Sequence, residues 1–287
     1  MNYECLICQV KALEKRVEKY EIPYNQRNKL ITGLLKKIAT IDLEKSYSPE
    51  ITSNILDILK GSSEIADPYL PEKKQGNREM LDRYLEYRKM IQQSGNPFNT
   101  ALRLAVAGNI IDFGPTHVFD VDGTIKQVLV TDFAINHSEQ LRQEIENAKT
   151  ILYLGDNAGE IVMDKLFLET LNHPNVWFAV RNEPVLNDVT RREAEEVGIG
   201  NVARIISNGD NAPSTLLHRV SDEFRQVYKQ ADLIISKGMG NYEGLMFEKD
   251  PRLFFLLMVK CDVIGRKIGA TKGDFVVKRN SGSRISF

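Results

Sequence analysis

TILYLGDNAGE, residues 150–160, carries the pattern on which the fold prediction depends: a short apolar run followed at once by a polar loop with two glycines. Three further apolar runs have the same character, at Val176–Val180, Val202–Ile206 and Leu233–Ser236. The segments between the runs have helical spacing, over 160–171, 187–197 and 214–230. Strands that alternate with helices indicate a parallel α/β sheet, with loops for ligand binding at the carboxyl ends of its strands.

The chain before this region is predicted to be helical. Apolar residues recur at helical spacing from Leu6 to Val17, and prolines separate the segments that follow. Those later helices are expected at about 26–41, 49–60, 75–93 and 97–112. We therefore expect an α/β protein with a helical N-terminal domain over 1–115 and a Rossmann-like three-layer α/β/α domain over 116–287.

The composition excludes several classes of protein. The 287 residues include 38 Lys and Arg against 39 Asp and Glu, so the formal net charge is −1, which argues against nucleic acid as a partner. The chain has neither an apolar run of the roughly 18 residues needed to cross a membrane nor a secretory signal pattern. Three cysteines do not make a disulfide framework, so we expect a cytoplasmic protein. Its oligomeric state is left open.

Oxygen donors follow the first two predicted strands. Asp156, Asn157 and Glu160 lie in the first loop, and Asp188 lies in the next one. A helix N-terminus suits an anion, but an anion beside carboxylates needs a cation between them, and such hard oxygen ligands suit Mg²⁺ or Mn²⁺. The alternative for each loop is a simple helix cap or Asx turn. The metal hypothesis requires that Asp156 and Asp188 lie close enough to share one ion.

The next two strand-end loops suggest a phosphate site. Ser207-Asn208-Gly209-Asp210 offers hydroxyl groups and backbone N–H groups, and Lys237 stands at a strand end beside two glycines. A lone lysine is more often a solvated surface charge. Four consecutive strand-end loops that carry Gly with Asp, Asn or Lys nevertheless favour a single rim for a metal and a phosphate.

Two other motifs compete with this interpretation. Val118–Thr124 (VFDVDGT) resembles the first motif of dehalogenase-type phosphatases, in which Asp120 would be the nucleophile. We favour instead an Asp-Gly hairpin turn, because the expected βα repeats have no room after it. Cys5 and Cys8 have the spacing of a redox or metal motif, but no predicted strand precedes them. They are either structural or part of a metal clip completed by distant residues.

Taken in order, the motifs resemble those of the metal-dependent damage-control phosphatase family, the ARMT-like group long known as a domain of unknown function. The resemblance covers nearly the whole chain, and the CxxC motif points to the prokaryotic, stand-alone branch. The matching segments are Cys5–Cys8, Asp67–Tyr69, Ala107–Asp112, Gly155–Glu160, Leu186–Thr190 and Lys237–Glu243.

The resemblance implies a phosphatase acting on small phosphorylated metabolites such as sugar phosphates or phosphopantetheine-like compounds. It implies a divalent cation (Mn, Co, Ni or Mg) held by Asp156, Asn157 and Asp188. Asp156, Glu160 and Lys237 are the candidate catalytic residues, and the residues leave open whether water attacks directly or Asp156 forms a phosphoenzyme. The candidate substrate-binding residues are Asn109, Ser207, Asn208, Gly209, Asp210, Lys237, Asn241 and Glu243. A non-catalytic phosphometabolite-binding protein is the remaining alternative.

Overall fold

Seven strands in the second half of the chain form one sheet in the computed structural model, which describes residues 1–108 and 121–280. Within these residues the strand order is β1-β7-β6-β5-β2-β3-β4. The strands from β6 to β4 are parallel, whereas β7 runs antiparallel to β6 and β1 runs parallel to β7. The bounds are β1 (Ile135–Asn136), β2 (Ile151–Leu154), β3 (Val176–Val180), β4 (Arg204–Ser207), β5 (Leu233–Lys237), β6 (Leu253–Met258) and β7 (Phe275–Arg279).

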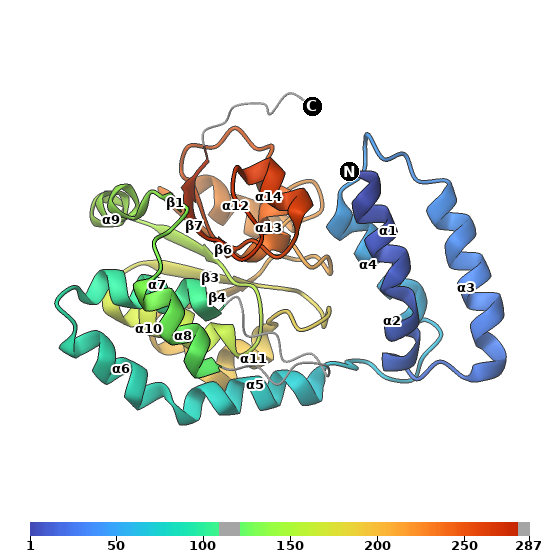
Figure 1. The fold of residues 1–287 in the computed structure, drawn as a ribbon, viewed down its shortest axis with the longest axis horizontal. Coiled ribbons are helices and arrows are strands. Elements are labelled where there is room, and N and C mark those ends of the chain that lie inside the picture. Colours follow the sequence, from blue (N-terminus) through green and yellow to red (C-terminus); the bar gives the residue numbers. More distant parts are fainter. Residues whose placement is uncertain (109–120, 281–287) are drawn as a thin grey trace.

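Helices cover both faces of this sheet, which confirms the predicted α/β class (Figure 1). One face packs with α7 and α10 into the largest hydrophobic core, and the other packs against α12, α13 and α14. The helices of this half are α8 (Val121–Val130), α9 (Ser138–Asn147), α10 (Glu160–Leu171), α11 (Arg191–Val197), α12 (Asp222–Gln230), α13 (Gly238–Leu245) and α14 (Asp262–Ile268), with a 3₁₀ turn at Ile199–Asn201.

The N-terminal part is helical as predicted and divides into two groups. Helices α1–α4, blue in Figure 1, share a separate core, whereas α5–α7 belong to the core beneath the sheet. The predicted helix over 75–93 is two helices, which meet at Arg83. The bounds are α1 (Tyr3–Lys11), α2 (Leu13–Lys19), α3 (Tyr24–Ala39), α4 (Ser48–Lys60), α5 (Leu70–Asp82), α6 (Tyr84–Gln93) and α7 (Pro97–Gly108).

The predicted Asp-Gly hairpin is wrong, because helix α8 begins at Val121 and contains Gly123. Ile125 and Val128 lie three residues apart and are both buried, so helical spacing aligns them on one face. That pattern outweighs the local turn preference of Asp-Gly. Asp120, the nucleophile of the dehalogenase alternative, lies outside the described residues.

Among the described residues, no helix is both long and apolar enough to span a bilayer.

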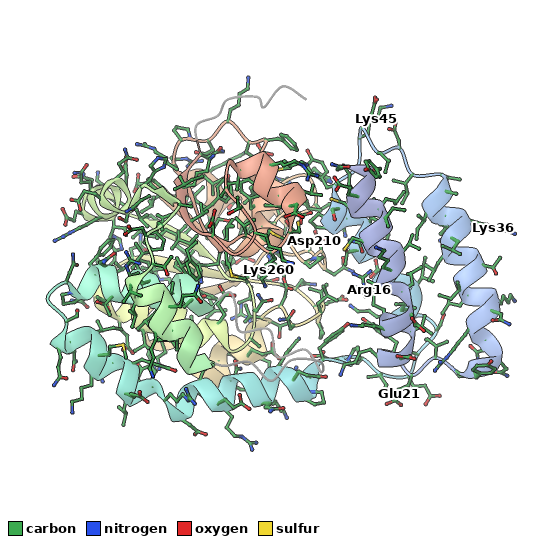
Figure 2. All side chains as sticks on the ribbon, viewed as in Figure 1. Arg16, Glu21, Lys36, Lys45, Asp210 and Lys260 are labelled. Atoms are coloured by element: carbon green, nitrogen blue, oxygen red, sulfur yellow. The ribbon has the colours of Figure 1, made fainter. Side chains whose placement is uncertain are left out.

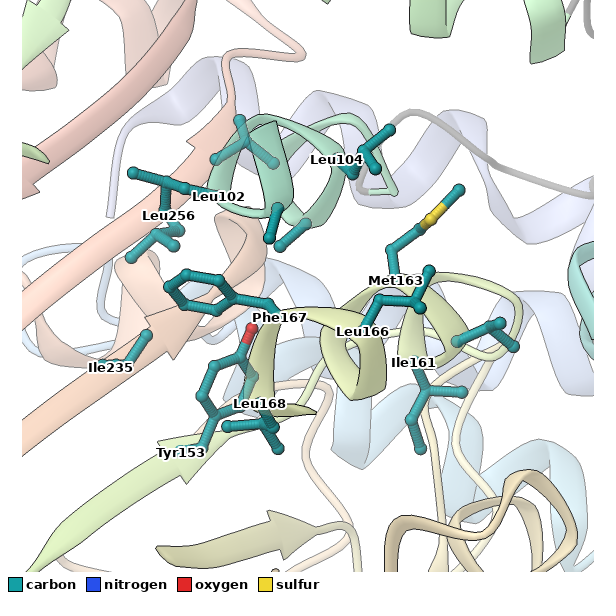
Figure 3. Close-up of a cluster of buried hydrophobic side chains, with 14 of the residues drawn as sticks. Leu102, Leu104, Tyr153, Ile161, Met163, Leu166, Phe167, Leu168, Ile235 and Leu256 are labelled. Carbon is teal, nitrogen blue, oxygen red and sulfur yellow. The ribbon is translucent and has the colours of Figure 1, made fainter. Parts of the chain in front are cut away.

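The core beneath the sheet is organised around helix α10. Figure 3 shows Phe167 between helix α7 above it and the strand residues Tyr153 and Ile235. Phe167 is fully buried, and its ring lies 5.9 Å from that of Phe98. Burial of this kind holds α10 in place, and the first turn of α10 opens onto the carboxyl edge of the sheet.

Replacement of Phe167 by alanine should therefore lower the free energy of unfolding by about 3–5 kcal/mol, through lost burial and the cavity left behind. Urea denaturation followed by circular dichroism measures it. Leu85→Ala is the control, since Leu85 is 74% exposed, and its cost should stay within about 0.5 kcal/mol. Equal effects of the two substitutions would contradict the assigned role of Phe167.

Candidate active site

The strand order brings the polar loops that follow β2 and β5 next to each other at the carboxyl edge of the sheet. From β2 the chain moves outward through β3 to β4 and then returns to β5 on the other side of β2. The direction of winding therefore reverses between β2 and β5, and the loops after such strands leave a crevice at their carboxyl ends. The loop that begins at Gly155 and the helix that begins at Gly238 lie at this point.

The loops after β2 and β3 are paired directly. Asn157 and Asp188 form an isolated antiparallel bridge. The Ala158 N–H donates to the Asn187 carbonyl, and the Val189 N–H donates to the Asp156 carbonyl, both at 2.9 Å. Backbone bonds thus hold Asp156 and Asp188 side by side, as the metal hypothesis requires.

Arg181, to which the sequence analysis assigned no role, joins the two carboxylates. Its Nε lies 2.7 Å from Asp188 Oδ2, and its Nη2 lies 3.9 Å from Asp156 Oδ1. The guanidinium also donates to Thr215 Oγ1 at 3.4 Å and to Asn241 Oδ1 at 3.1 Å. Arg181 is only 2% exposed, so it is a fixed part of the site. Its one signal in the sequence is a charge directly after an apolar strand.

The Asn157 side chain is oriented by its neighbours. Its Nδ2 donates to Asp156 Oδ2 at 2.8 Å and to Glu160 Oε2 at 3.1 Å. Because both contacts use the amide nitrogen, the amide oxygen is the atom that could face a cation. Glu160 therefore acts on this candidate ligand through a hydrogen bond.

Lys237 was expected at the rim with its ammonium free to bind phosphate, but the structure places it in the interior. It is fully buried and donates to the Ala105 carbonyl at 2.8 Å, to Glu160 Oε1 at 2.6 Å and to Asp164 Oδ1. These three partners use all three N–H bonds of the ammonium. Burial lowers the pKa of Lys237, but Asp164 and Glu160 outweigh it and raise the pKa above its ordinary value.

Asp164 completes this buried group. Its Oδ1 also accepts a hydrogen bond from the Tyr153 hydroxyl at 2.7 Å. Burial raises the pKa of Asp164 to about 7. Asp164 lies one helical turn after Glu160 on α10, so both carboxylates face the same lysine.

The loop after β4 uses its polar groups mainly to hold its own shape. Ser207 Oγ donates to Asn182 Oδ1 at 3.1 Å, and Asn208 Nδ2 donates to the Ser214 carbonyl at 3.3 Å. Asp210 pairs with Arg219 at 2.7 Å. Gly209 has a φ of +79°, and a Cβ there would lie 2.5 Å from the Ser221 side chain, so the turn requires glycine.

The two predicted residues of helix α13 have different surroundings. Asn241 lies in the centre of the site, where its Nδ2 donates to the carbonyls of Gly155 and Lys237 at 3.1 and 2.8 Å. Glu243 instead hydrogen-bonds with Ser48 of α4, and burial raises its pKa to about 7. The hydrogen-bond partner of Glu243 therefore lies in the N-terminal helices, whereas Asn241 bonds to the loop after β2. Asn109 lies outside the described residues.

The charge balance of the site fits a divalent cation. The cluster contains the carboxylates of Asp156, Glu160, Asp164 and Asp188, and two cations, Arg181 and Lys237, are bonded to them. Burial and the charges of Glu160 and Asp188 raise the pKa of Asp156 to about 8. Carboxylate and amide oxygens are the ligands that Mg²⁺ and Mn²⁺ prefer. Among residues 1–108 and 121–280, no group of three or more His, Cys, Asp or Glu side chains is arranged to hold a metal ion. The candidate metal site therefore depends on the Asn157 amide oxygen as a ligand.

The cysteine motif lies elsewhere. Cys5 and Cys8 are in helix α1, and all three cysteines are free. Burial, with a contribution from Glu243, raises the pKa of Cys5, and Cys261 also acts on it. The three thiols thus lie near one another and near Glu243, and their role stays a prediction.

Comparison with known proteins shows one consistent likeness. A family model for the damage-control phosphatase ARMT1-like domain matches residues 1–276. A damage-control phosphatase of Pyrococcus horikoshii is 30% identical over 98% of both chains. Another, from Archaeoglobus fulgidus, is 30% identical over 75% of this chain and 76% of its own. The crystal structure of a DUF89 family protein from Pyrococcus horikoshii superposes with a TM-score of 0.85, at 28% identity, and covers 98% of this chain and 99% of that one.

The raised pKa of Asp156 makes stability depend on pH in the metal-free protein. A folded-state pKa of about 8, against an ordinary value of 3.8, means that the folded protein binds this proton more tightly than the unfolded chain does. The resulting stabilisation is complete below the ordinary value and is lost as the pH rises through the folded value. Unfolding in urea at pH 5 and pH 8, with chelator present, measures this loss.

The free energy of unfolding should fall less between pH 5 and pH 8 in Asp156→Asn than in wild type, by at least about 1 kcal/mol, because the amide does not titrate. Asp222→Asn is the matched control, since the Asp222 side chain is 91% exposed, and it should keep the wild-type dependence. An identical pH dependence in all three proteins would contradict the raised pKa.

Proposed function

Since this chain belongs to the damage-control phosphatase ARMT1-like domain family, we propose that it is a divalent-metal-dependent phosphatase that hydrolyses small phosphorylated metabolites. One observation carries the metal dependence. Asp156 and Asp188, on adjacent strand-end loops, share a single guanidinium, and burial beside Glu160 and Asp188 raises the pKa of Asp156. A buried group of acidic side chains with so few cations is typical of a site that a metal cation completes.

Asp156, Asn157 and Asp188 would hold this cation, which we expect to be Mn²⁺, Co²⁺, Ni²⁺ or Mg²⁺. When bound, a divalent cation supplies positive charge next to the phosphoryl group and acidifies water at the site. Phosphoryl transfer depends mainly on such positioning and charge stabilisation.

The chain's own residues prepare the site by orientation. Arg181 holds the Asp188 carboxylate through a charged hydrogen bond of 2.7 Å. Glu160 fixes the Asn157 amide, and Lys237 neutralises Glu160. Glu160 and Lys237 are therefore proposed as positioning residues, which changes the catalytic role that the sequence analysis gave them.

The substrates are proposed to be sugar phosphates or phosphopantetheine-like compounds. The near-neutral charge of the chain favours a small anionic ligand over a polyanion such as nucleic acid. In the eukaryotic branch of the family that the sequence resembles, the loop after the lysine at this position contains an acidic residue and leucine. This chain has Met239-Gly240 there instead, after Lys237. The preferred ester is therefore to be found by a screen over many phosphometabolites.

Asp156→Ala and Asp188→Ala should each reduce metal-dependent hydrolysis of p-nitrophenyl phosphate by at least about a thousandfold, because each loses a ligand of the proposed cation. Asp222→Ala, on the exposed face of α12, serves as the control and should keep wild-type activity. Circular dichroism checks that the variants fold. Full activity in both site variants would overturn the metal assignment.

Chelation provides an independent test. EDTA should abolish turnover, and added Mn²⁺, Co²⁺, Ni²⁺ or Mg²⁺ should restore it. Turnover that resists EDTA, together with loss of activity in Asp120→Asn, would favour the dehalogenase-type mechanism. Tight binding of phosphate esters with no turnover in any cation would identify a binding protein instead.

A further inference from the structure

The proposed reaction needs hydrogen-bond donors for the oxygens of the phosphoryl group, and the predicted donor is already engaged. Lys237 gives its three N–H bonds to Ala105, Glu160 and Asp164. Arg181 is likewise bonded to Asp188 and Asn241. A phosphate site at this edge of the sheet therefore requires other buried donors.

Helix α5 presents two such donors, Lys73 and Asn77, one helical turn apart. Both are buried, with exposures of 1% and 4%. Asn77 Oδ1 accepts a hydrogen bond of 2.7 Å from the Gly159 N–H, at the N-cap of α10. This contact fixes the orientation of the Asn77 amide, since only its oxygen can accept from an N–H.

The other end of that amide is unpaired. Asn77 Nδ2 is buried and has no hydrogen-bond partner among the described residues. A buried donor without a partner is costly and is rare in folded proteins. Asn77 thus places two unused N–H bonds beside the loop that carries Asp156 and Asn157, where the N-terminus of the twelve-residue helix α10 also favours an anion.

Lys73 adds a positive charge on the same helix, one turn before Asn77. Within the described part of the chain, Asp67 Oδ2 is the one hydrogen-bond acceptor of its ammonium, at 3.0 Å, which leaves two N–H bonds for another acceptor. Asp67 is also paired with Arg192 at 3.0 Å, and Arg192 in turn pairs with Glu193 at 2.7 Å, so Asp67 and Glu193 share two cations, Arg192 and Lys73. The charge of Lys73 reaches the site, because it counts among the groups that lower the pKa of Asp188.

We propose that Lys73 and Asn77 form the subsite that binds the phosphoryl oxygens of the substrate, between helix α5 and the N-terminus of α10. This inference rests on the proposed phosphatase function, and inorganic phosphate is the simplest ligand of the subsite. The subsite contains no metal ligand, so phosphate binding and metal binding can be separated by mutation.

The test uses two conservative substitutions. Asn77→Asp keeps the acceptor for Gly159 but replaces the unpaired donor with a carboxylate oxygen that repels phosphate. Lys73→Gln removes the charge and keeps a polar side chain of similar length. Lys74→Gln, at the exposed neighbouring position, is the matched control.

The full-length protein is measured with Mn²⁺ present. Each subsite variant should raise the Kd for inorganic phosphate, and the KM for p-nitrophenyl phosphate, by about tenfold or more, because a hydrogen bond or ion pair to a charged oxygen is lost. Mn²⁺ binding, measured by electron paramagnetic resonance, should stay within about threefold of wild type, which a general loss of structure would not allow. Lys74→Gln should match wild type in all three measurements.

The outcomes separate the two proposals. Unchanged phosphate Kd and KM in either folded variant would overturn the subsite while leaving the phosphatase intact. If wild type binds phosphate, the variants bind it weakly, and no ester is hydrolysed in any cation, the subsite stands and the proposed function falls. Should one variant fail to fold, the other decides the question alone.

Discussion

The structure depends on burying several carboxylates at one edge of a parallel sheet. Arg181 and Lys237 each lie between two of these carboxylates, and both cations are almost completely buried. Buried charges are tolerated only when they are paired and hydrogen-bonded. Each cation therefore holds two elements together: Arg181 holds the loops after β2 and β3, and Lys237 holds strand β5 against helix α10. Burial, with the charges of Glu160 and Asp188, raises the pKa of Asp156, although Arg181 lowers it. The burial that makes the ion pairs necessary is therefore also the main cause of the raised pKa of Asp156.

Close approach of the backbone makes this arrangement possible. A Cβ on Gly155 would lie 2.7 Å from the ring of Phe178, and a Cβ on Gly240 would collide with the Pro213 carbonyl. Glycine at these two positions lets the first loop pack against β3 and helix α13 pack against the segment at Pro213. Asn241 of α13 in turn donates to the Gly155 carbonyl. The carboxylates are thus gathered by backbone packing at the point where the strand order reverses.

Much of this could be predicted from the sequence, because the signals are local. Strands buried on both faces appear as continuous apolar runs, and the polar loop after each run marks the edge where a ligand can bind. The partners of the charged residues could not be predicted in this way. Lys237 was predicted to bind phosphate, but its contact with Glu160 and Asp164 exists only because α10 crosses β5 in the folded chain. Arg181 and Asn77 are ordinary polar residues until folding brings distant segments to them.

The helices before the sheet are part of the site, because three of them reach different loops of the rim. The Ala105 carbonyl of α7 accepts from Lys237, Asn77 of α5 bonds to Gly159, and Ser53 of α4 donates to Asn211 at 2.9 Å in the loop after β4. Each contact joins residues more than eighty positions apart, so the geometry of the rim depends on contacts with the N-terminal helices. A sheet edge with so many buried charges would be unstable without these contacts. The N-terminal helices therefore stabilise the carboxylate cluster as well as bordering it, which explains why the likeness to the family extends over residues 1–276 and is not confined to the sheet.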